Sequence, residues 1–183
     1  MQRRLFADYI SKLLTAANTV SEDSLNKMIE TLRGARDSCI YIIGNGGSAA
    51  IASHFATDLF RAFEITNLSN RVVSLTDNTS LLTASGNDFG FETIFERQLS
   101  QLCREKDVLV AISSSGNSEN IIRAVHAAKN EGLVSIGLSG FDGGRLLDSV
   151  DISVHVSTKH GEYQIVEDIH SSICHFVSSS IAL

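Results

Sequence analysis

Histidine and carboxylate side chains gather on two stretches of the chain that have helical periodicity. His54 and Asp58 are four residues apart, a spacing that places both on one face of a helix. Near the C-terminus, Glu167, His170 and His175 lie in a Ser-rich, apolar stretch. Such a set can move protons as general acid and base, or it can bind a metal. Each residue taken alone is equally compatible with a charged helix surface or a hydrogen-bonded histidine.

Helix geometry limits how the C-terminal residues can combine. Glu167 and His175 are eight residues apart, which is about 12 Å along a helix axis at 1.5 Å per residue. One straight helix would therefore hardly bring both to the same ion. Both could serve one site if neighbouring subunits each contribute a residue to it.

Two loops of small residues could bind an anion or a sugar. The first, Gly44-Asn45-Gly46-Gly47-Ser48-Ala49-Ala50, has glycines that let a ligand approach the backbone. The second, Ser113-Ser114-Ser115-Gly116-Asn117-Ser118, offers four hydroxyls and an amide. Each loop opens into a predicted helix, whose free N–H groups suit an anion. Each could also be a plain strand-to-helix turn with a serine cap, but two such loops at one sheet edge favour a binding site.

The loops do not match the common nucleotide motifs. The first loop formally fits the dinucleotide fingerprint, which requires an acidic residue about 20 positions further on. Here Asp77, at the end of the next strand, lies more than 30 residues from Gly44, so the spacing does not match. Neither loop carries the Gly-Lys-Ser/Thr of a P-loop. A hydroxyl-rich cradle of this kind suits a small phosphate monoester and sugar hydroxyls.

Asn87 and Asp88 form a third polar feature. They follow Gly86, near which we expect a break between two helices. They would either cap a helix there or face the cleft.

The elements that must position these residues alternate between strands and helices. Apolar, β-branched runs predict strands at 39–43, 71–75, 107–112, 134–138 and 152–156. Periodic segments predict helices at 4–19, 24–33, 48–60, 79–102 (in two pieces), 118–131 and 163–181. This order predicts an α/β fold, a three-layer α/β/α sandwich around a five-stranded parallel sheet with an N-terminal helical extension. Ligands in such folds bind at the carboxyl ends of the strands, where both loops lie.

Composition excludes several classes of protein. The 183 residues are 43% apolar and 20% charged, which is typical of a globular domain and not of a disordered chain. The formal net charge of −6 disfavours nucleic-acid binding. No apolar run is long enough to span a membrane. Three scattered cysteines and an acidic residue at position 8 predict a reduced, cytoplasmic protein.

Taken together, these motifs resemble the phosphoheptose isomerases, which are sugar-isomerase (SIS) domain proteins. The resemblance rests on the two loops, on His54-Phe55-Ala56, on Gly86-Asn87-Asp88-Phe89-Gly90-Phe91, and on Asp168-Ile169-His170 with His175. It extends in order over nearly the whole chain. It implies one SIS domain over residues 1–183, in which helices within 1–36 pack on the sheet or on a neighbouring subunit.

The resemblance also implies an activity and an assembly. The family converts sedoheptulose 7-phosphate to D-glycero-D-manno-heptose 7-phosphate for bacterial surface polysaccharide, including lipopolysaccharide. It forms homotetramers with active sites at subunit interfaces. By the family pattern, Ser113, Ser114, Ser115 and Ser118 hold the phosphate. The remaining substrate-binding positions are Asn45, Gly46, Gly47, Ser48, Asn87, Asp88 and Glu167.

The family pattern places Zn²⁺ on His54, Asp58, Glu167 and His175, and makes Asp58 and His175 the acid/base pair. An aldose–ketose isomerase moves a proton between adjacent carbons through an enediol(ate), which needs such a pair. Zinc would polarise the substrate carbonyl. The serine loop would fix the position of the reacting carbons.

The chain departs from the family at several positions. Asp58 stands where the family has Glu, and Glu167 where it has Gln. Ile51 replaces an acidic residue, and Arg61-Ala62-Phe63 replaces Gly-Arg-Tyr. Two alternatives therefore stay open. One is an isomerase of another phosphorylated sugar; the other is a non-catalytic SIS regulator that binds a sugar phosphate or a protein.

Overall fold

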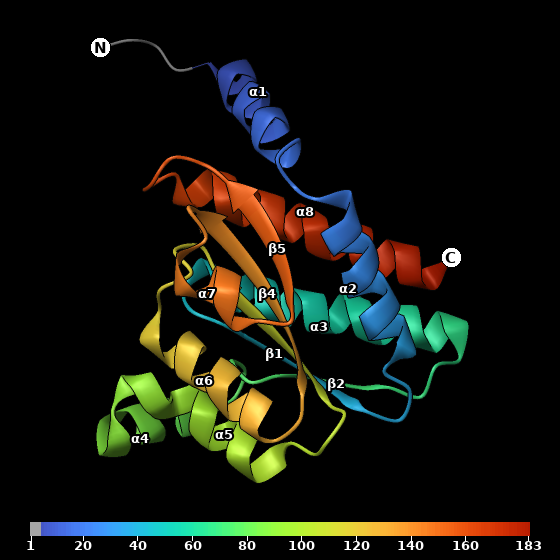
Figure 1. Cartoon of the computed structure of the whole chain (residues 1–183), viewed down its shortest axis with the longest axis vertical. Helices are drawn as coiled ribbons and strands as arrows, with labels where there is room; N and C mark the ends of the chain where they lie inside the picture. The colour runs from blue at the N-terminus through green and yellow to red at the C-terminus, as the bar shows by residue number, and fades with distance from the viewer. Residues whose placement is uncertain (1–4) are drawn as a thin grey trace.

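The computed structural model describes residues 5–183, and its centre is a parallel sheet (Figure 1). The strands are β1 (Cys39–Gly44), β2 (Arg71–Ser74), β3 (Val108–Ser113), β4 (Val134–Phe141) and β5 (Ile152–Ser157). The helices are α1 (Phe6–Ala17), α2 (Glu22–Gly34), α3 (Gly47–Thr66), α4 (Thr79–Phe89), the 3₁₀ turn η1 (Phe91–Thr93), α5 (Ile94–Leu102), α6 (Glu119–Asn130), α7 (Gly144–Ser149) and α8 (Tyr163–Ala182).

The strand order is β2-β1-β3-β4-β5, and every pairing is parallel. Strands β1 and β3 are buried along their whole length, which explains why their sequences are continuous apolar runs rather than alternating ones. Along β1, Ile40 and Ile42 face one core, and Tyr41 and Ile43 face the other. The predicted α/β sandwich is confirmed.

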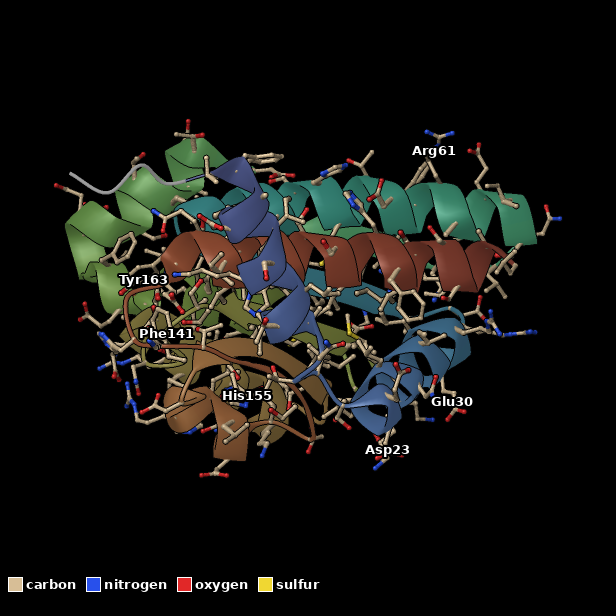
Figure 2. The ribbon with its side chains drawn as sticks, turned by 90° about the horizontal axis from the view of Figure 1, so that it is seen from above. Asp23, Glu30, Arg61, Phe141, His155 and Tyr163 are labelled. Carbon is tan, nitrogen blue, oxygen red and sulfur yellow. The ribbon has the colours of Figure 1, made fainter. Side chains whose placement is uncertain are left out.

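The two faces of the sheet carry different helices. Helices α2, α3 and α8 fill the first core with side chains such as Met28, Phe55 and Val177. Helices α5, α6 and α7 cover the opposite face with Phe95, Val125 and others. Helices α3 and α8 run side by side over the first face (Figure 2). This pairing matters for the site because both helices carry predicted site residues.

Helix α1 packs mainly on α8. The Tyr9 hydroxyl donates to the Asp168 carboxylate at 2.6 Å, and Lys12 pairs with Glu162 at 3.0 Å. Arg4, at the start of the predicted first helix, lies outside the described residues. None of the helices within residues 5–183 combines the length and apolarity needed to cross a bilayer.

Several predicted element boundaries are wrong. The predicted division of 79–102 into two helical pieces is confirmed, but helix α4 continues through Gly86, near which the break was predicted, and ends before Gly90. Gly90 has φ +92°, a conformation that costs glycine little, whereas Gly86 is helical and its position has room for a side chain beside Ile94. Helix α3 runs to Thr66, beyond the predicted end at residue 60, because Ala62 and Phe63 continue its buried face. Helix α7 was not predicted at all.

The topology singles out one edge of the sheet. From β1 the chain moves outward to β2, whereas β3, β4 and β5 follow one another in the opposite direction. The carboxyl ends of β1 and β3 are therefore the switch point at which ligands bind in open α/β sheets. Both small-residue loops begin there.

Candidate active site

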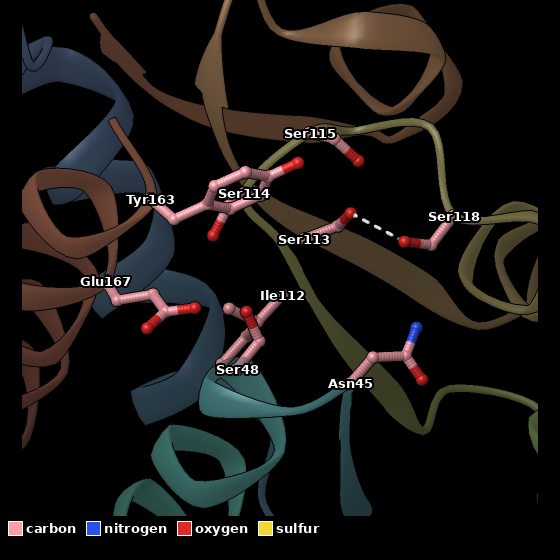
Figure 3. Close-up of a pocket in the computed structure, with 9 residues that line it drawn as sticks. All are labelled: Asn45, Ser48, Ile112, Ser113, Ser114, Ser115, Ser118, Tyr163 and Glu167. Atoms are coloured by element: carbon pink, nitrogen blue, oxygen red, sulfur yellow. Dashed lines mark hydrogen bonds between the residues drawn. The ribbon is translucent and has the colours of Figure 1, made fainter. Parts of the chain in front are cut away.

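A cavity of about 180 Å³ opens at the switch point between β1 and β3 (Figure 3). It is lined by Asn45, Ser48, Ile112, Ser113, Ser114, Ser115, Ser118, Tyr163 and Glu167. Its side chains offer hydroxyls, one amide and one carboxylate. The two loops singled out in the sequence thus form one pocket, with α8 as its third side.

A pair of side-chain amides ties the two loops together. Asn45 donates to the Asn120 side chain at 2.8 Å, and Asn120 donates back to Asn45 at 2.9 Å. Asn120 lies in the first turn of α6 and is only 2% exposed. One N–H of the Asn45 amide stays available to a ligand, since the amide group has two. Sequence reasoning missed Asn120, because nothing local marks a partner 75 residues away.

The first loop brings α3 unusually close to α8. The Glu167 carboxylate lies against Gly47, and a side chain at position 47 would require this carboxylate to move. Gly46 caps α3 with a positive φ of 53° and has no side chain to occupy the helix end. Ser48 is nearly buried and faces the cavity.

The serine loop is held by the end of β4 and by α7. The Ser114 carbonyl accepts from Gly140 N at 3.1 Å, and the Gly116 carbonyl accepts from Leu146 N at 2.9 Å. Ser113 donates to Ser118 through their hydroxyls at 3.4 Å. The Ser115 hydroxyl accepts from the backbone N–H of Asn117 at 3.2 Å. The loop is therefore shaped before any ligand arrives.

Ser114 carries a polar atom that needs a partner. Its hydroxyl oxygen is buried and has no hydrogen bond to any described residue. An unsatisfied buried hydroxyl costs about 1–3 kcal/mol. Because Ser114 lines the cavity, a ligand with an acceptor or donor at this point would satisfy it.

A second cluster lies further along α3 and α8. The Asp58 carboxylate is 3.7 Å from His54 Nε2 and 3.6 Å from His175 Nε2. One donor atom from each of the three residues lies within 4.8 Å of the other two. Two imidazoles and one carboxylate are a common donor set for zinc, and three protein ligands leave a coordination position open for substrate. The residues present therefore fit the metal that the sequence analysis expected.

Glu167 lies apart from this cluster. It contacts α3 at Gly47, whereas His175, eight residues later, meets Asp58. Because the spacing is about 12 Å along α8, Glu167 lines the pocket while His175 belongs to the cluster. Burial, and secondarily the nearby Asp168 carboxylate, raise the pKa of Glu167 above its usual value. Within one chain, His54, Asp58 and His175 therefore lie together, while the fourth expected zinc residue, Glu167, lies apart.

Asn87 and Asp88 lie on the surface of α4, outside the residues that line the pocket. The Asn87 amide donates to the Asp88 carboxylate at 2.8 Å, and both side chains are exposed. The described chain does not bring them to the serine loop.

The positions that depart from the family pattern also have clear surroundings. Ile51 is half-buried and packs against the first core, and Ala62 and Phe63 are buried in it. The Arg61 side chain points away from the body of the molecule (Figure 2). In this chain these positions serve packing and the surface rather than the pocket.

Tyr163 was not singled out in the sequence, and His170, which was grouped there with Glu167 and His175, lies outside both the pocket and the cluster. Tyr163, the first residue of α8, lines the cavity. His170 is fully buried, and its Nε2 donates to the Ser139 carbonyl at 3.2 Å. Desolvation lowers the pKa of His170 to about 4, so this histidine is neutral near pH 7. Their placement depends on how α8 sits on the sheet, which local sequence does not show.

Comparison with known proteins agrees with this geometry. A profile of the SIS domain matches residues 5–140. The phosphoheptose isomerase of Nitratidesulfovibrio vulgaris is 41% identical over 155 residues, covering 85% of this chain and 73% of the relative. That of Bordetella avium is 38% identical over 175 residues, covering 90% and 89%. The structure of the phosphoheptose isomerase of Neisseria gonorrhoeae superposes with a TM-score of 0.85 at 35% identity, covering 96% of both chains. The chain therefore belongs to the phosphoheptose isomerase family of SIS-domain proteins, as its motifs predicted.

Proposed function

We propose that this protein is an aldose–ketose isomerase that converts sedoheptulose 7-phosphate to D-glycero-D-manno-heptose 7-phosphate. The observation that carries the proposal is the pairing of two features along α3 and α8. One is a hydroxyl-lined pocket that contains an unsatisfied serine, and the other is a histidine–carboxylate cluster. The similar proteins named above are phosphoheptose isomerases, which supports the same reaction here.

Both features border α3, and the proposal places one substrate across the two. From Ser48 to His54 along α3 is six residues, or about 9 Å at 1.5 Å per residue. A substrate anchored by its phosphate among the serines would thus reach the cluster with its carbonyl end. Anchoring one end fixes the reacting carbons, and such positioning supplies a large part of the rate in enzymes.

The chemistry would then depend on Asp58 and His175. The Asp58 carboxylate takes the proton from the carbon next to the carbonyl, and His175 moves a proton at the substrate oxygens. The proton returns to the neighbouring carbon, which exchanges ketose for aldose through an enediol(ate). Zinc bound by His54, Asp58 and His175 would supply Lewis-acid polarisation of the carbonyl.

The remaining substrate contacts belong to the same proposal. Asn45, Gly46, Gly47 and Ser48 would meet the sugar end of the substrate from the first loop. Glu167, whose raised pKa favours its protonated form more than usual, would hydrogen-bond sugar hydroxyls. Asn87 and Asp88 would reach the substrate of a second copy.

We further infer that the protein works as a homotetramer of single SIS domains in the cytoplasm, where its product would feed surface-polysaccharide synthesis. Three apolar side chains of α1 support an assembly, since Phe6, Ile10 and Leu14 are 78%, 46% and 65% exposed along one helix face. His54 and His175 are also more than half exposed in one chain. A neighbouring copy would cover the site and exclude water.

The test is turnover of sedoheptulose 7-phosphate by the purified protein, after chelation and after zinc is restored. Zinc-dependent formation of the aldose supports the proposal. A folded protein that turns over none of this substrate in either condition contradicts it.

A second candidate is an isomerase of another phosphorylated sugar. It is favoured by the carboxylate of Glu167 and the ring of Tyr163, which give the pocket an acidic acceptor and an aromatic wall. A panel of five- to seven-carbon ketose phosphates separates the two candidates by their kcat/KM values.

A further inference from the structure

Tyr163 places an aromatic ring in a pocket that is otherwise lined by small polar side chains. It is the first residue of α8 and extends from that helix toward Ser114 and Ser115 (Figure 3). Its side chain remains partly exposed, which leaves the phenol free to meet a ligand. A tyrosine in such a position supplies a rigid apolar wall and one hydroxyl.

The ring of Tyr163 rests on Phe141, the last residue of β4. The two rings are 4.9 Å apart between centroids at an interplanar angle of 85°, the edge-to-face arrangement that aromatic pairs favour. Phe141 is 3% exposed, so Tyr163 packs against a buried ring. Figure 2 shows the two side chains at the same end of the molecule, by the start of α8.

Phe141 holds its ring there at a conformational cost. Its φ of 54° is left-handed, a strained conformation for a bulky residue. Its carbonyl accepts from His155 Nε2 at 3.2 Å and from Thr158 N at 3.4 Å. The centroid of the His160 ring lies 5.0 Å from that of the Phe141 ring. The backbone is therefore held in this conformation by several contacts, which is typical of a residue that shapes a site.

The same strand end also fixes the opposite wall of the pocket. Gly140, the residue before Phe141, donates its N–H to the Ser114 carbonyl. Tyr163 and the serine loop thus both contact the end of β4. The position of the ring relative to the serines therefore depends on contacts with this strand end.

We propose that Tyr163 is a specificity-determining residue of the pocket. Its ring, held against Phe141, limits the width available to the sugar, and its hydroxyl donates a hydrogen bond to the phosphate or a neighbouring sugar hydroxyl. This inference rests on the proposed sugar-phosphate isomerase function. Tyr163 would thus decide which phosphorylated ketose fits the pocket.

The test compares Tyr163→Phe and Tyr163→Ala with the parent enzyme, using five-, six- and seven-carbon ketose phosphates. Tyr163→Phe keeps the ring and loses one hydrogen bond, so KM should rise about three- to tenfold, while kcat stays within about twofold. Tyr163→Ala removes the wall, and the parent's kcat/KM preference among the three substrates should fall at least about fivefold, as one lost apolar wall permits. The matched control is His160→Ala, which takes the other ring from Phe141 but does not line the pocket. It should leave KM and preference within about twofold of the parent.

Circular dichroism and thermal unfolding verify that each variant folds, and Tyr163→Phe preserves the test if Tyr163→Ala does not. Unchanged KM values and unchanged preference in an active enzyme overturn the role of Tyr163 alone. If the parent turns over none of the three substrates, the proposed function fails. Calorimetric dissociation constants for the same sugar phosphates then decide the role of Tyr163. Weaker binding by Tyr163→Phe supports it, while equal binding, or no binding by the parent, overturns it.

Discussion

At the scale of single residues, Ser115 and His175 take part in different steps of the proposed reaction. His175→Ala removes a proton-transfer group, so kcat should fall about 10²- to 10⁴-fold with KM little changed. Ser115→Ala removes a hydrogen bond to a charged phosphate, so KM should rise about ten- to hundredfold while kcat changes less. Steady-state kinetics on sedoheptulose 7-phosphate checks both. Unchanged kcat in His175→Ala would remove this residue from the mechanism.

The three-residue cluster makes a separate prediction about metal. Asp58→Ala takes away the carboxylate that both histidines face, so zinc affinity should fall at least about tenfold. Asp168→Asn, which alters an exposed carboxylate outside the cluster, is the matched control and should keep the parent affinity. Titration against a competing chelator measures both without any assay of activity. Equal zinc affinity in Asp58→Ala and the parent would contradict the cluster as a metal site.

Glu167→Gln adds a second comparison in the same titration. The distance between Glu167 and the cluster in one chain predicts unchanged zinc affinity. A clear loss in the assembled protein would show that a neighbouring chain brings Glu167 to the metal.

At the scale of elements, the Asn45–Asn120 pair joins the loop before α3 to the start of α6. Asn120→Ala leaves the Asn45 amide without its partner, which should lower the free energy of unfolding by about 1–3 kcal/mol. It should also raise KM, because the two loops no longer hold one geometry. Asn130→Ala, at the exposed end of the same helix, should change stability by less than about 0.5 kcal/mol. Thermal unfolding and steady-state kinetics compare the two variants. Equal effects of the two substitutions would contradict a structural role for the Asn45–Asn120 pair.

Because α8 buries His170 against β4, the free energy of unfolding should depend on pH. In the unfolded chain His170 binds a proton below about pH 6.5, but in the folded protein its pKa is lowered to about 4. Protons therefore favour unfolding, so the contribution of His170 is complete above about pH 6.5 and is lost as the pH falls toward 4. The loss amounts to roughly 3 kcal/mol at about 1.4 kcal/mol per pH unit.

His170→Gln tests this dependence, because its amide can still donate to the Ser139 carbonyl but does not titrate. Denaturant unfolding in the presence of a chelator should show a flatter stability profile between pH 4 and 6.5 than in the parent. His126→Gln, on the exposed face of α6, should keep the parent profile. Parallel profiles for the parent and His170→Gln would show that His170 is not the group responsible.

At the scale of the whole molecule, the apolar face of α1 bears on assembly. Replacing Phe6, Ile10 and Leu14 together by serine removes exposed apolar area and should lower the mass measured by light scattering. Activity should fall with it if neighbouring copies cover the site. Val134→Ser, an exposed apolar position at the start of β4, is the control for the substitution itself. An unchanged mass in the triple variant would place the assembly contact elsewhere.

The sequence alone determined the α/β order, the two loops and the pairing of His54 with Asp58. All of these depend on local spacing: strand and helix periods, small residues at strand ends, and a four-residue step on one helix face. The family resemblance then assigned roles to those residues. Element ends were less well predicted, as Gly86 and Gly90 show, because either glycine could end a helix and only packing decides which one does.

Only the tertiary structure decided which distant residues meet. The position of α8 along α3 puts Glu167 against Gly47 and His175 against Asp58, which divides a set that the sequence analysis had grouped together. The same seating brings Tyr163 to the serine loop, buries His170 on β4, and leaves Asn87 and Asp88 outside the pocket. These outcomes depend on the register between elements far apart in the chain. That register is set by side-chain packing in the core, which no local pattern encodes.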